Sequence, residues 1–392
     1  MYLCSRNKKI ANMTNDELMS KTISSLRFPL TVMVVMGHFN FVNNDRGFGI
    51  HGVMYGQHMP DYLKWLINYP GMTLVTMGVP LFFMIAGYLF FFGKTFNFEV
   101  YKKKLKNRFH SLFIPYVMWN TIAILLIAIR FLPIFSSLVP GMDQVKVNLT
   151  LSGFLHTYYD NFHNEGLFIY PFETLKTTTM PIDAPLWFVR DLMYAVLISP
   201  VLYWLIKKLK FWAIVFWAVL SYVISPLVAP NGTSFGMLLD APFFFSWGAY
   251  YSINKLNLIV EMRKLKWIPY IYIPMSFLDT YLYNNNMFVH YVSVPLGAIT
   301  AIVIMSYLLE KGIVKENKLL SESSFFVFCM HMTIMWEMGK AVFMILHLGD
   351  DPLTLLLFFF GIVTLTILVC LGTYVILNRY VPKFCRLLTG GR

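Results

Sequence analysis

Long apolar runs alternate with short polar segments along the whole chain. Runs of the length that crosses a bilayer, about 17 to 25 residues, lie near 22–42, 71–92, 109–133, 187–206, 211–228, 236–253, 267–283, 290–309, 322–347 and 353–377. A helix satisfies its own backbone hydrogen bonds and can therefore cross hydrocarbon. The pattern predicts an all-α integral membrane protein, a bundle of about ten transmembrane helices.

The Lys and Arg residues of the polar segments follow the same alternation. Every second segment, from the N-terminus to the C-terminus, is basic, and together these segments hold 24 Lys and Arg residues. The segments between them hold only four, so by the positive-inside rule the basic side and both termini are cytoplasmic. This topology predicts a cytoplasmic segment at 1–21, a single polytopic membrane domain at 22–378 and a cytoplasmic tail at 379–392.

The composition agrees with this class of protein. Of the 392 residues, 57% are hydrophobic and 13% charged, and the mean hydropathy is +0.59, whereas a soluble domain is far more polar. The basic residues outnumber the acidic ones by 32 to 20, an excess that the membrane topology explains without a nucleic-acid partner. The four cysteines have no CxxC spacing, so neither a metal site nor a disulfide framework is expected.

One long segment, about 134–186, is predicted on the external side. It contains the aromatic and polar stretch "YYDNFHNEGLFIYPFETL" at 158–175. Aromatic residues favour the headgroup level, which would make the segment a cap on the bundle. Loops of this length are also often functional, which would make it a lid over an outward-facing site. Both interpretations fit the sequence.

Two ionisable residues lie in the first apolar run. Arg27 and His38 are 11 residues apart, about three helical turns, so they share one helix face about 16 Å apart along the axis. Ionisable side chains in hydrocarbon cost free energy and usually mark function. The structural alternatives are a snorkelling Arg27 and an interhelical hydrogen bond for His38. Their shared face favours a functional pair that lines one transmembrane tunnel.

The ninth run also contains ionisable residues. His331 lies at mid-depth in this run, where a buried imidazole is either a hydrogen-bonded structural residue or part of a site. Glu337 and Lys340 are three residues apart, so they can pair on one helix face and neutralise each other. We expect this pair to be structural rather than catalytic.

The fourth run opens with "PIDAPLWFVRDLM" at 181–193. Trp187 suits an interfacial anchor. Arg190 and Asp191 are adjacent and leave the helix in different directions, which predicts different partners for them. Asp240 and Asp279 occur at or inside the ends of later runs, and their spacing assigns them no role.

A basic cluster from Lys94 to Arg108, which includes Lys104, leads into the third run. The positive-inside rule alone accounts for such a cluster. The other interpretation is a binding site for a polyanion, such as the phosphates of a nucleotide-bearing cofactor, because Arg makes bidentate contacts with phosphate. The composition of the segment fits both.

Five short motifs together resemble the bacterial integral-membrane acyltransferases often called acyltransferase family three. In chain order they are "LRFPLTVMVVMGH" (26–38), "VPLFFMIAGYLF" (79–90), "RFHSLFIPYVMW" (108–119), "PLWFVRDL" (185–192) and "SSFFVFCMH" (323–331). The motifs are spread over most of the chain. The ten predicted spans with both termini inside also agree with this family.

The resemblance implies an acyl-CoA-dependent O-acyltransferase of the bacterial plasma (inner) membrane. It would transfer an acyl group, usually acetyl, from cytoplasmic acyl-CoA to a hydroxyl of a cell-envelope glycan or lipid-linked acceptor, with acyl-CoA as a cosubstrate and no bound cofactor. By the same resemblance His38 is the catalytic histidine, and Arg27 is a second catalytic residue that assists donor binding. Arg108 and Lys104 of the basic cluster are further candidates for donor binding. The family commonly has a second basic residue three positions after the Arg of the third motif, where this chain has Ser111.

Acyl transfer from a thioester needs a base for the acceptor hydroxyl, and His is suited to this task near neutral pH. It also needs donors for the developing oxyanion. From their place in the predicted spans, Trp187, Arg190 and His331 are the candidate acceptor or oxyanion contacts.

Two other functions use the same residues. A transporter of small molecules or lipids would line a pathway with Arg27, His38 and Arg190, and it would move its substrate without covalent change. A member of the separate membrane-bound O-acyltransferase superfamily would depend on His331 in place of His38. Acyl-transfer assays on variants of the two histidines distinguish these functions.

Overall fold

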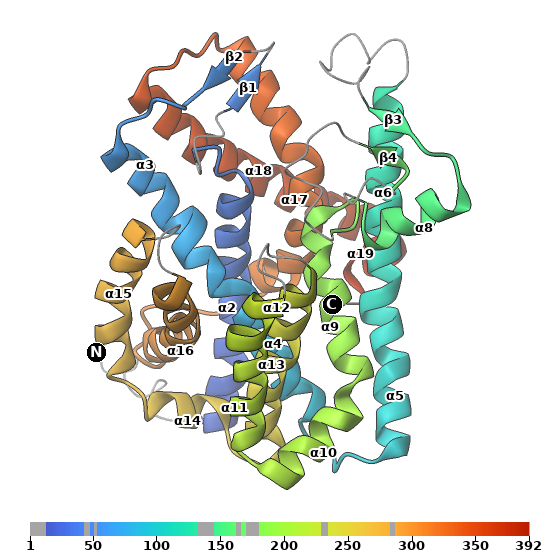
Figure 1. Ribbon diagram of the computed structural model, residues 1–392, viewed down its shortest axis with the longest axis vertical. Coiled ribbons are helices and arrows are strands. Elements are labelled where there is room, and N and C mark those ends of the chain that lie inside the picture. Colours follow the sequence, from blue (N-terminus) through green and yellow to red (C-terminus); the bar gives the residue numbers. More distant parts are fainter. Residues whose placement is uncertain are drawn as a thin grey trace, which may run out of the picture.

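The computed structural model describes residues 13–42, 48–50, 53–131, 145–161, 166–169, 180–228, 234–282 and 287–391. Helices make up most of this part and form an elongated bundle, with two short strand pairs near one end (Figure 1). The helices are α2 Asn15–His38, α3 Asp61–Asn68, α4 Gly78–Phe91, α5 Phe98–Arg108, α6 Ile114–Arg130, α8 Leu151–Tyr159, α9 Trp187–Leu197, α10 Ser199–Leu209, α11 Trp212–Val219, α12 Ser225–Val228, α13 Ser234–Ile253, α14 Leu258–Arg263, α15 Ile268–Leu282, α16 Met287–Glu310, α17 Lys318–Ile345, α18 Pro352–Tyr380 and α19 Pro382–Thr389. The strands are β1 Phe48–Ile50, β2 Val53–Tyr55, β3 Lys146–Val147 and β4 Phe168–Ile169, and β1 pairs with β2, and β3 with β4, antiparallel.

Each of the ten predicted apolar runs falls on helix, which confirms a mostly helical membrane architecture. Among the described helices, five are long and apolar enough to cross a membrane: Asp61–Phe91, Phe98–Arg130, Phe288–Glu310, Lys318–Ile345 and Pro352–Tyr380. The pair α9 and α10 is bent by 61° and makes a sixth if it counts as one span. The count of about ten spans and the cytoplasmic position of the termini stay predictions.

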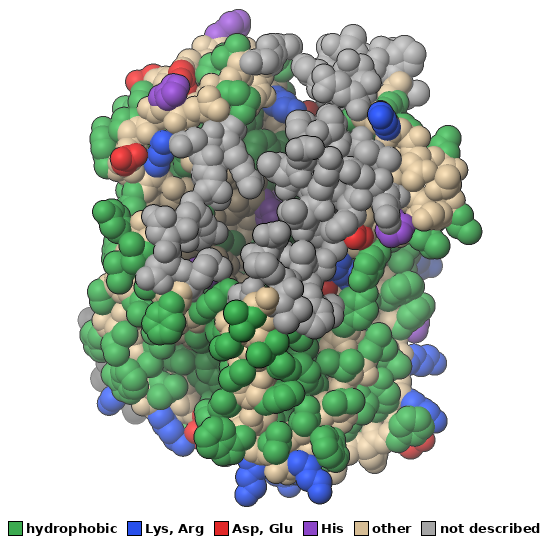
Figure 2. All heavy atoms as spheres, viewed as in Figure 1, with side chains coloured by type: hydrophobic (Ala, Val, Ile, Leu, Met, Phe, Trp, Pro, Cys, Tyr) green, Lys and Arg blue, Asp and Glu red, His purple; other side chains and the backbone are tan. Residues whose placement is uncertain are grey.

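The outer surface has the polarity expected of such a protein. Hydrophobic side chains cover the middle and lower part of the face drawn in Figure 2, and Lys and Arg side chains gather at its lower end. The start of α5 and the end of α10 lie at that end of the bundle (Figure 1). The basic segments at 93–108 and 207–210 therefore share one side, as the alternation of charge predicts.

Helix α2 packs against α4, α16, α17 and α18, which places Arg27 and His38 inside the bundle. It begins at Asn15, earlier than the predicted 22, and ends at His38, short of the predicted 42. The early start has a local cause. The Thr14 hydroxyl accepts the backbone N–H of Glu17 at 3.2 Å, and the Glu17 carboxylate accepts the backbone N–H of Thr14 at 2.9 Å, a capping box that extends the helix beyond its apolar part.

Small polar residues join α2 to α17. The Ser24 hydroxyl donates to the Ser321 hydroxyl at 2.8 Å, and Thr31 lies 3.5 Å from the carbonyl oxygen of Ser324. Short side chains of this kind let membrane helices approach closely and hydrogen-bond across their contact. The motif residues of the first and ninth runs are therefore neighbours.

The contact between α4 and α13 depends on two glycines. A Cβ atom on Gly248 would lie 1.8 Å from the carbonyl oxygen of Met84, and one on Gly87 would lie 2.0 Å from that of Phe245. Any larger residue at these positions would push the two backbones apart. The close crossing of small residues is a common way for membrane helices to pack.

The predicted Glu337–Lys340 pair is confirmed, with 3.6 Å between the Lys340 ammonium and the Glu337 carboxylate. Arg130 at the end of α6 joins it, with its guanidinium 3.2 Å from the same carboxylate. This cluster links α6 to α17 and supports its assignment as structural.

The described part of the predicted external segment consists of α8 and the strand pair β3–β4; residues 132–144, 162–165 and 170–179 lie outside the described residues. The backbone N–H of Ile182 donates to the carbonyl of Thr157 at 2.9 Å. Arg190 of α9 donates to the carbonyl of Tyr159 at 2.8 Å. These bonds hold α8 against the start of the fourth run.

Replacing Gly248 with Ala should destabilise the bundle, because the new Cβ would overlap the Met84 carbonyl and force α4 and α13 apart. We expect a loss of about 1–3 kcal/mol, the usual cost of overpacking, measured as a lower melting temperature of the detergent-solubilised protein. Gly361→Ala on α18 is the matched control, since nothing lies within 4 Å of a Cβ built there. Equal melting temperatures of the two variants would contradict the close crossing.

Candidate active site

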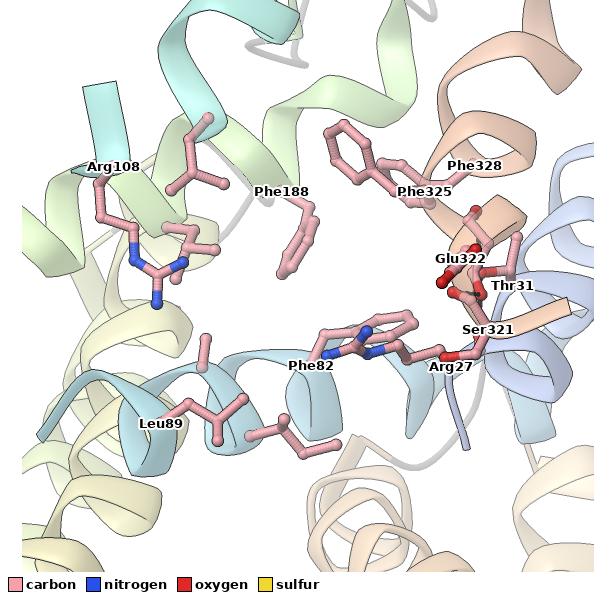
Figure 3. Close-up of a pocket in the computed structure, with 15 residues that line it drawn as sticks. Arg27, Thr31, Phe82, Leu89, Arg108, Phe188, Ser321, Glu322, Phe325 and Phe328 are labelled. Carbon is pink, nitrogen blue, oxygen red and sulfur yellow. Dashed lines mark hydrogen bonds between the residues drawn. The ribbon is translucent and has the colours of Figure 1, made fainter. Parts of the chain in front are cut away.

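Arg27 of α2 and Arg108 at the end of α5 point toward each other across a cavity of about 150 Å³ (Figure 3). We call this the arginine cavity. Among the described residues, neither guanidinium has a carboxylate within ion-pair distance. Two such cations in mainly apolar surroundings favour an anionic ligand. The other lining residues include Thr31, Phe82, Leu89, Phe188, Ser321, Glu322, Phe325 and Phe328.

Lys104 lies about one turn before Arg108 but does not line the arginine cavity. Its ammonium donates to the carbonyl of Phe90 and lies 5.3 Å from the centre of the Phe90 ring. It therefore joins α5 to the end of α4. Ser111, where the family commonly has a second basic residue, lies against the C-terminal end of α19, since a Cβ on Gly390 would be 2.4 Å from its carbonyl oxygen.

A second cavity, of about 370 Å³, lies at the C-terminal end of α2 and is lined by His38. We call this the histidine cavity. Trp187, one of the predicted contacts, lines it too. Besides His38, the polar and aromatic members of the described lining are Asn40, Thr76, Phe83, Trp187, Tyr222, Asp240, Phe244, His290 and Tyr291.

His331 of α17 is fully buried next to His38, with 5.3 Å between the two ring centres. Its Nδ1 lies 3.2 Å from the carbonyl oxygen of Val327. A carbonyl only accepts, so this contact assigns the proton to Nδ1 and leaves Nε2 as an acceptor. Nε2 has no hydrogen-bond partner among the described residues, and His331 is not in the described lining of either the arginine cavity or the histidine cavity.

The described linings of the two cavities have no residue in common, and one tunnel along Arg27 and His38 stays a prediction. Aromatic rings connect the linings of the two cavities. The ring of Phe188 lies 5.8 Å from that of Phe82, a neighbour in the arginine cavity, and 4.8 Å from that of Phe83, which lines the histidine cavity. Arg27 and His38 lie on one helix, α2, as the sequence predicts. The helical period gives no information about the side chains that other helices place near these two residues.

The prediction of different partners for Arg190 and Asp191 is wrong. Arg190 Nε lies 2.8 Å from Asp191 Oδ1, and the two side chains are 5% and 0% exposed. Neighbouring backbone positions do point apart, but the long Arg side chain bends back along the helix to neutralise a buried carboxylate. Arg190 lines neither cavity.

Asp183 is buried just before the short 3₁₀ turn Ala184–Leu186 that leads into α9. Its backbone N–H donates to the side-chain oxygen of Asn120 at 3.1 Å. Its two carboxyl oxygens have no hydrogen-bond partner within the part of the chain that the structure describes. Burial therefore raises the pKa of Asp183 well above its usual value, which favours the neutral acid at this position.

Within the described part of the chain, no three His, Cys, Asp or Glu side chains come close enough together to ligate a metal ion.

The structure brings Arg27 together with Arg108, and His38 together with Trp187. Sequence reasoning did not single out His290 and gave no role to Asp240 or Asp279. His290 carried the same signal as His38, an ionisable residue in an apolar run. Asp240 and Asp279 could be connected to it only by the packing of three helices.

Residues 21–375 match the family profile described as an acyltransferase domain. A 197-residue part of the chain is 28% identical to the succinoglycan biosynthesis protein ExoH of Rhizobium meliloti (strain 1021). This alignment covers 50% of the chain and 46% of that relative, so it spans less than half of the relative's length. No solved structure matches the chain significantly.

Replacing Asp191 with Asn should destabilise the fold strongly, because the buried guanidinium of Arg190 would lose its carboxylate. Removing one partner of a buried pair costs about 3–5 kcal/mol, which would be measured as a lower melting temperature. Glu99→Gln removes one partner of an exposed pair, whose side chains are 58% and 83% exposed, and should change little. A melting temperature of Asp191→Asn equal to that of Glu99→Gln would show that the buried pair does not stabilise the bundle.

Proposed function

The chain belongs to acyltransferase family three, and from this premise we propose that it is a membrane O-acyltransferase that transfers an acyl group from acyl-CoA to a hydroxyl of a cell-envelope glycan or lipid-linked acceptor. The observation that carries this proposal is the presence of two cavities along one helix. The cavity at Arg27 is cationic, whereas the described lining of the cavity at His38 contains no Lys or Arg. A relative named for succinoglycan biosynthesis supports a glycan as the acceptor.

The arginine cavity suits the acyl donor. Acyl-CoA carries phosphate groups at one end and its thioester, usually of an acetyl group in this family, at the end of a long flexible arm. Arg27 and Arg108 bind phosphate oxygens through charge-assisted hydrogen bonds, and the aromatic lining receives the less polar arm. The neighbouring basic segment, Lys104 included, adds positive potential that attracts a polyanion.

His38 acts as the general base. The acceptor hydroxyl gives its proton to the imidazole of His38 while its oxygen bonds to the carbonyl carbon of the thioester. The tetrahedral intermediate then collapses, the carbon–sulfur bond breaks, and the CoA thiolate takes the proton back from His38. The products are an ester and CoA, so atoms and charge balance within the two substrates and one imidazole.

His331 holds His38 in its working state. With its Nδ1 proton used by the Val327 carbonyl, His331 offers an acceptor rather than a donor, which suits a positioning residue better than an oxyanion contact. Two neighbouring imidazoles also disfavour two positive charges. His38 is therefore kept in the neutral form that can accept a proton.

We place the protein in a bacterial plasma (inner) membrane, with the basic side and both termini in the cytoplasm. Arg27 precedes His38 on α2 by about 16 Å along the helix axis, so the arginine cavity is nearer to the cytoplasm and the histidine cavity nearer to the outside. This order suits a cytoplasmic donor and an external acceptor. The transporter alternative has less support, because residues 21–375 match an acyltransferase family.

Replacing His38 with Ala should lower acyl transfer by about 10²–10⁴-fold, the usual contribution of a general base. The measurement is transfer of radiolabel from labelled acetyl-CoA to envelope material in membranes that carry matched amounts of each protein. His58→Ala, at an exposed position outside both cavities, is the control. Undiminished transfer in His38→Ala with loss in His331→Ala would move the base to His331, and no transfer by the wild type from any acyl-CoA would favour the transporter.

Replacing Arg27 or Arg108 with Gln should raise the KM for acetyl-CoA about tenfold, because each change removes a charged phosphate contact. The KM for a truncated donor, S-acetyl pantetheine, should not change, since that compound has no phosphates. Lys102→Gln, on the exposed side of α5 and paired with Glu99 at 3.7 Å, is the control for net charge. An equal rise for both donors would show that the two arginines do not recognise phosphate.

A further inference from the structure

The histidine cavity contains ionisable groups that the proposed proton transfer does not use. Asp240 lies on α13 and His290 near the start of α16, and both line the cavity together with His38 of α2. Ionisable side chains inside an apolar bundle are rare, and by default they mark a pathway or a site. Three helices thus bring polar groups to one cavity.

Each of the two groups is held by a neighbour. Asp240 accepts a hydrogen bond from the hydroxyl of Ser221. The Nδ1 of His290 lies 3.3 Å from both carboxyl oxygens of Asp279, whose side chain is 1% exposed. Asp279 thus orients the imidazole of His290, and Ser221 orients the carboxylate of Asp240. Groups that are oriented before a ligand arrives lower the free-energy cost of binding.

Flat aromatic surfaces form another part of the wall. The rings of Tyr222 and Tyr291 stack with 4.7 Å between their centres and 11° between their planes, and Trp187 lines the same cavity. A cavity with aromatic walls and a few placed polar groups has the composition of a small-molecule site. The ligand that fits it has apolar faces and hydrogen-bonding edges.

The charge and the volume of the histidine cavity limit the class of ligand that it can bind. The described lining contains a carboxylate and no Lys or Arg, so it favours a neutral ligand over a phosphate or another anion. The volume of about 370 Å³ lies at the small end of the usual range for ligand sites, about 300–1,000 Å³. A pyranose ring has the required size, apolar C–H faces and hydroxyl groups that both donate and accept.

We propose that the histidine cavity binds one sugar residue of the acceptor, with hydroxyls on Asp240 and His290 and a ring face against the aromatic wall. This binding presents one further hydroxyl to His38. The inference rests on the proposed function, which already names a glycan acceptor, and adds to it the residues that hold one sugar of that acceptor. Asp279 is a positioning residue in this site, because it acts through His290.

The test uses the full chain in lipid nanodiscs and a sugar probe that partitions into membranes, octyl β-glucoside below its critical micelle concentration. Saturation-transfer NMR on the sugar protons measures its dissociation constant without any acyl donor. We expect binding by the wild type, weakened at least tenfold in Asp240→Asn and in His290→Gln, and we expect octyl phosphate not to displace the glucoside. If one variant does not fold, the other decides the outcome.

Asp61→Asn is the matched control, because Asp61 is an exposed carboxylate on α3 outside the cavity. It should bind the glucoside as the wild type does. Unchanged binding in folded Asp240→Asn and His290→Gln, displacement by octyl phosphate, or no binding by the wild type would each overturn the sugar site.

A second readout separates this inference from the proposed function. When acetyl-CoA is added, the KM for octyl β-glucoside should rise in Asp240→Asn while the KM for acetyl-CoA stays the same. Glucoside that binds through Asp240 but is never acylated would refute the acyltransferase and leave the sugar site in place. Acyl transfer to envelope material without glucoside binding would refute the sugar site and leave the proposed acyltransferase in place.

Discussion

Hydrocarbon offers no hydrogen bonds, so an ionisable side chain inside an apolar bundle has to meet a partner, a cavity or the end of its helix. Helix α2 carries two such side chains into the bundle, and the helices around it are packed to receive them. Arg27 reaches the arginine cavity, and His38 reaches the histidine cavity at the last residue of the helix. The close glycine crossing of α4 with α13 and the hydroxyl contacts of α2 with α17 give these cavities firm walls.

The two cavities suit two different kinds of chemistry. Binding phosphates needs fixed positive charge, whereas a histidine that accepts a proton must start neutral. A nearby cation would favour the neutral imidazole, but it would also repel the imidazolium that forms when the proton is accepted. Separate cavities on one helix meet both needs. The ring of Phe188 lies 4.8 Å from that of Phe83 and 5.8 Å from that of Phe328, so it contacts lining residues of both cavities.

Predictions that depended on one helix were mostly correct. The apolar runs became helices, and Glu337 and Lys340 paired because residues three apart share a face. The prediction for Arg190 and Asp191 used backbone direction alone and was wrong, because a long side chain can turn back to a buried neighbour. The capping box that starts α2 at Asn15 was readable from Thr14 and Glu17, but it lies in a polar segment that hydropathy does not mark.

The sequence by itself determined the class of protein, the position of its helices, the basic side and the rarity of Arg27, His38 and His331 in their runs. These features are local, since hydropathy, charge and helical period are properties of neighbouring residues. The tertiary structure decided which polar residues share a cavity. Asp240 and His290 lie on helices far from α2 in the chain, and they meet His38 only because the helices pack in one particular arrangement. Contacts between helices depend on side chains that the chain brings together from distant positions, and the period of a single helix carries no record of them.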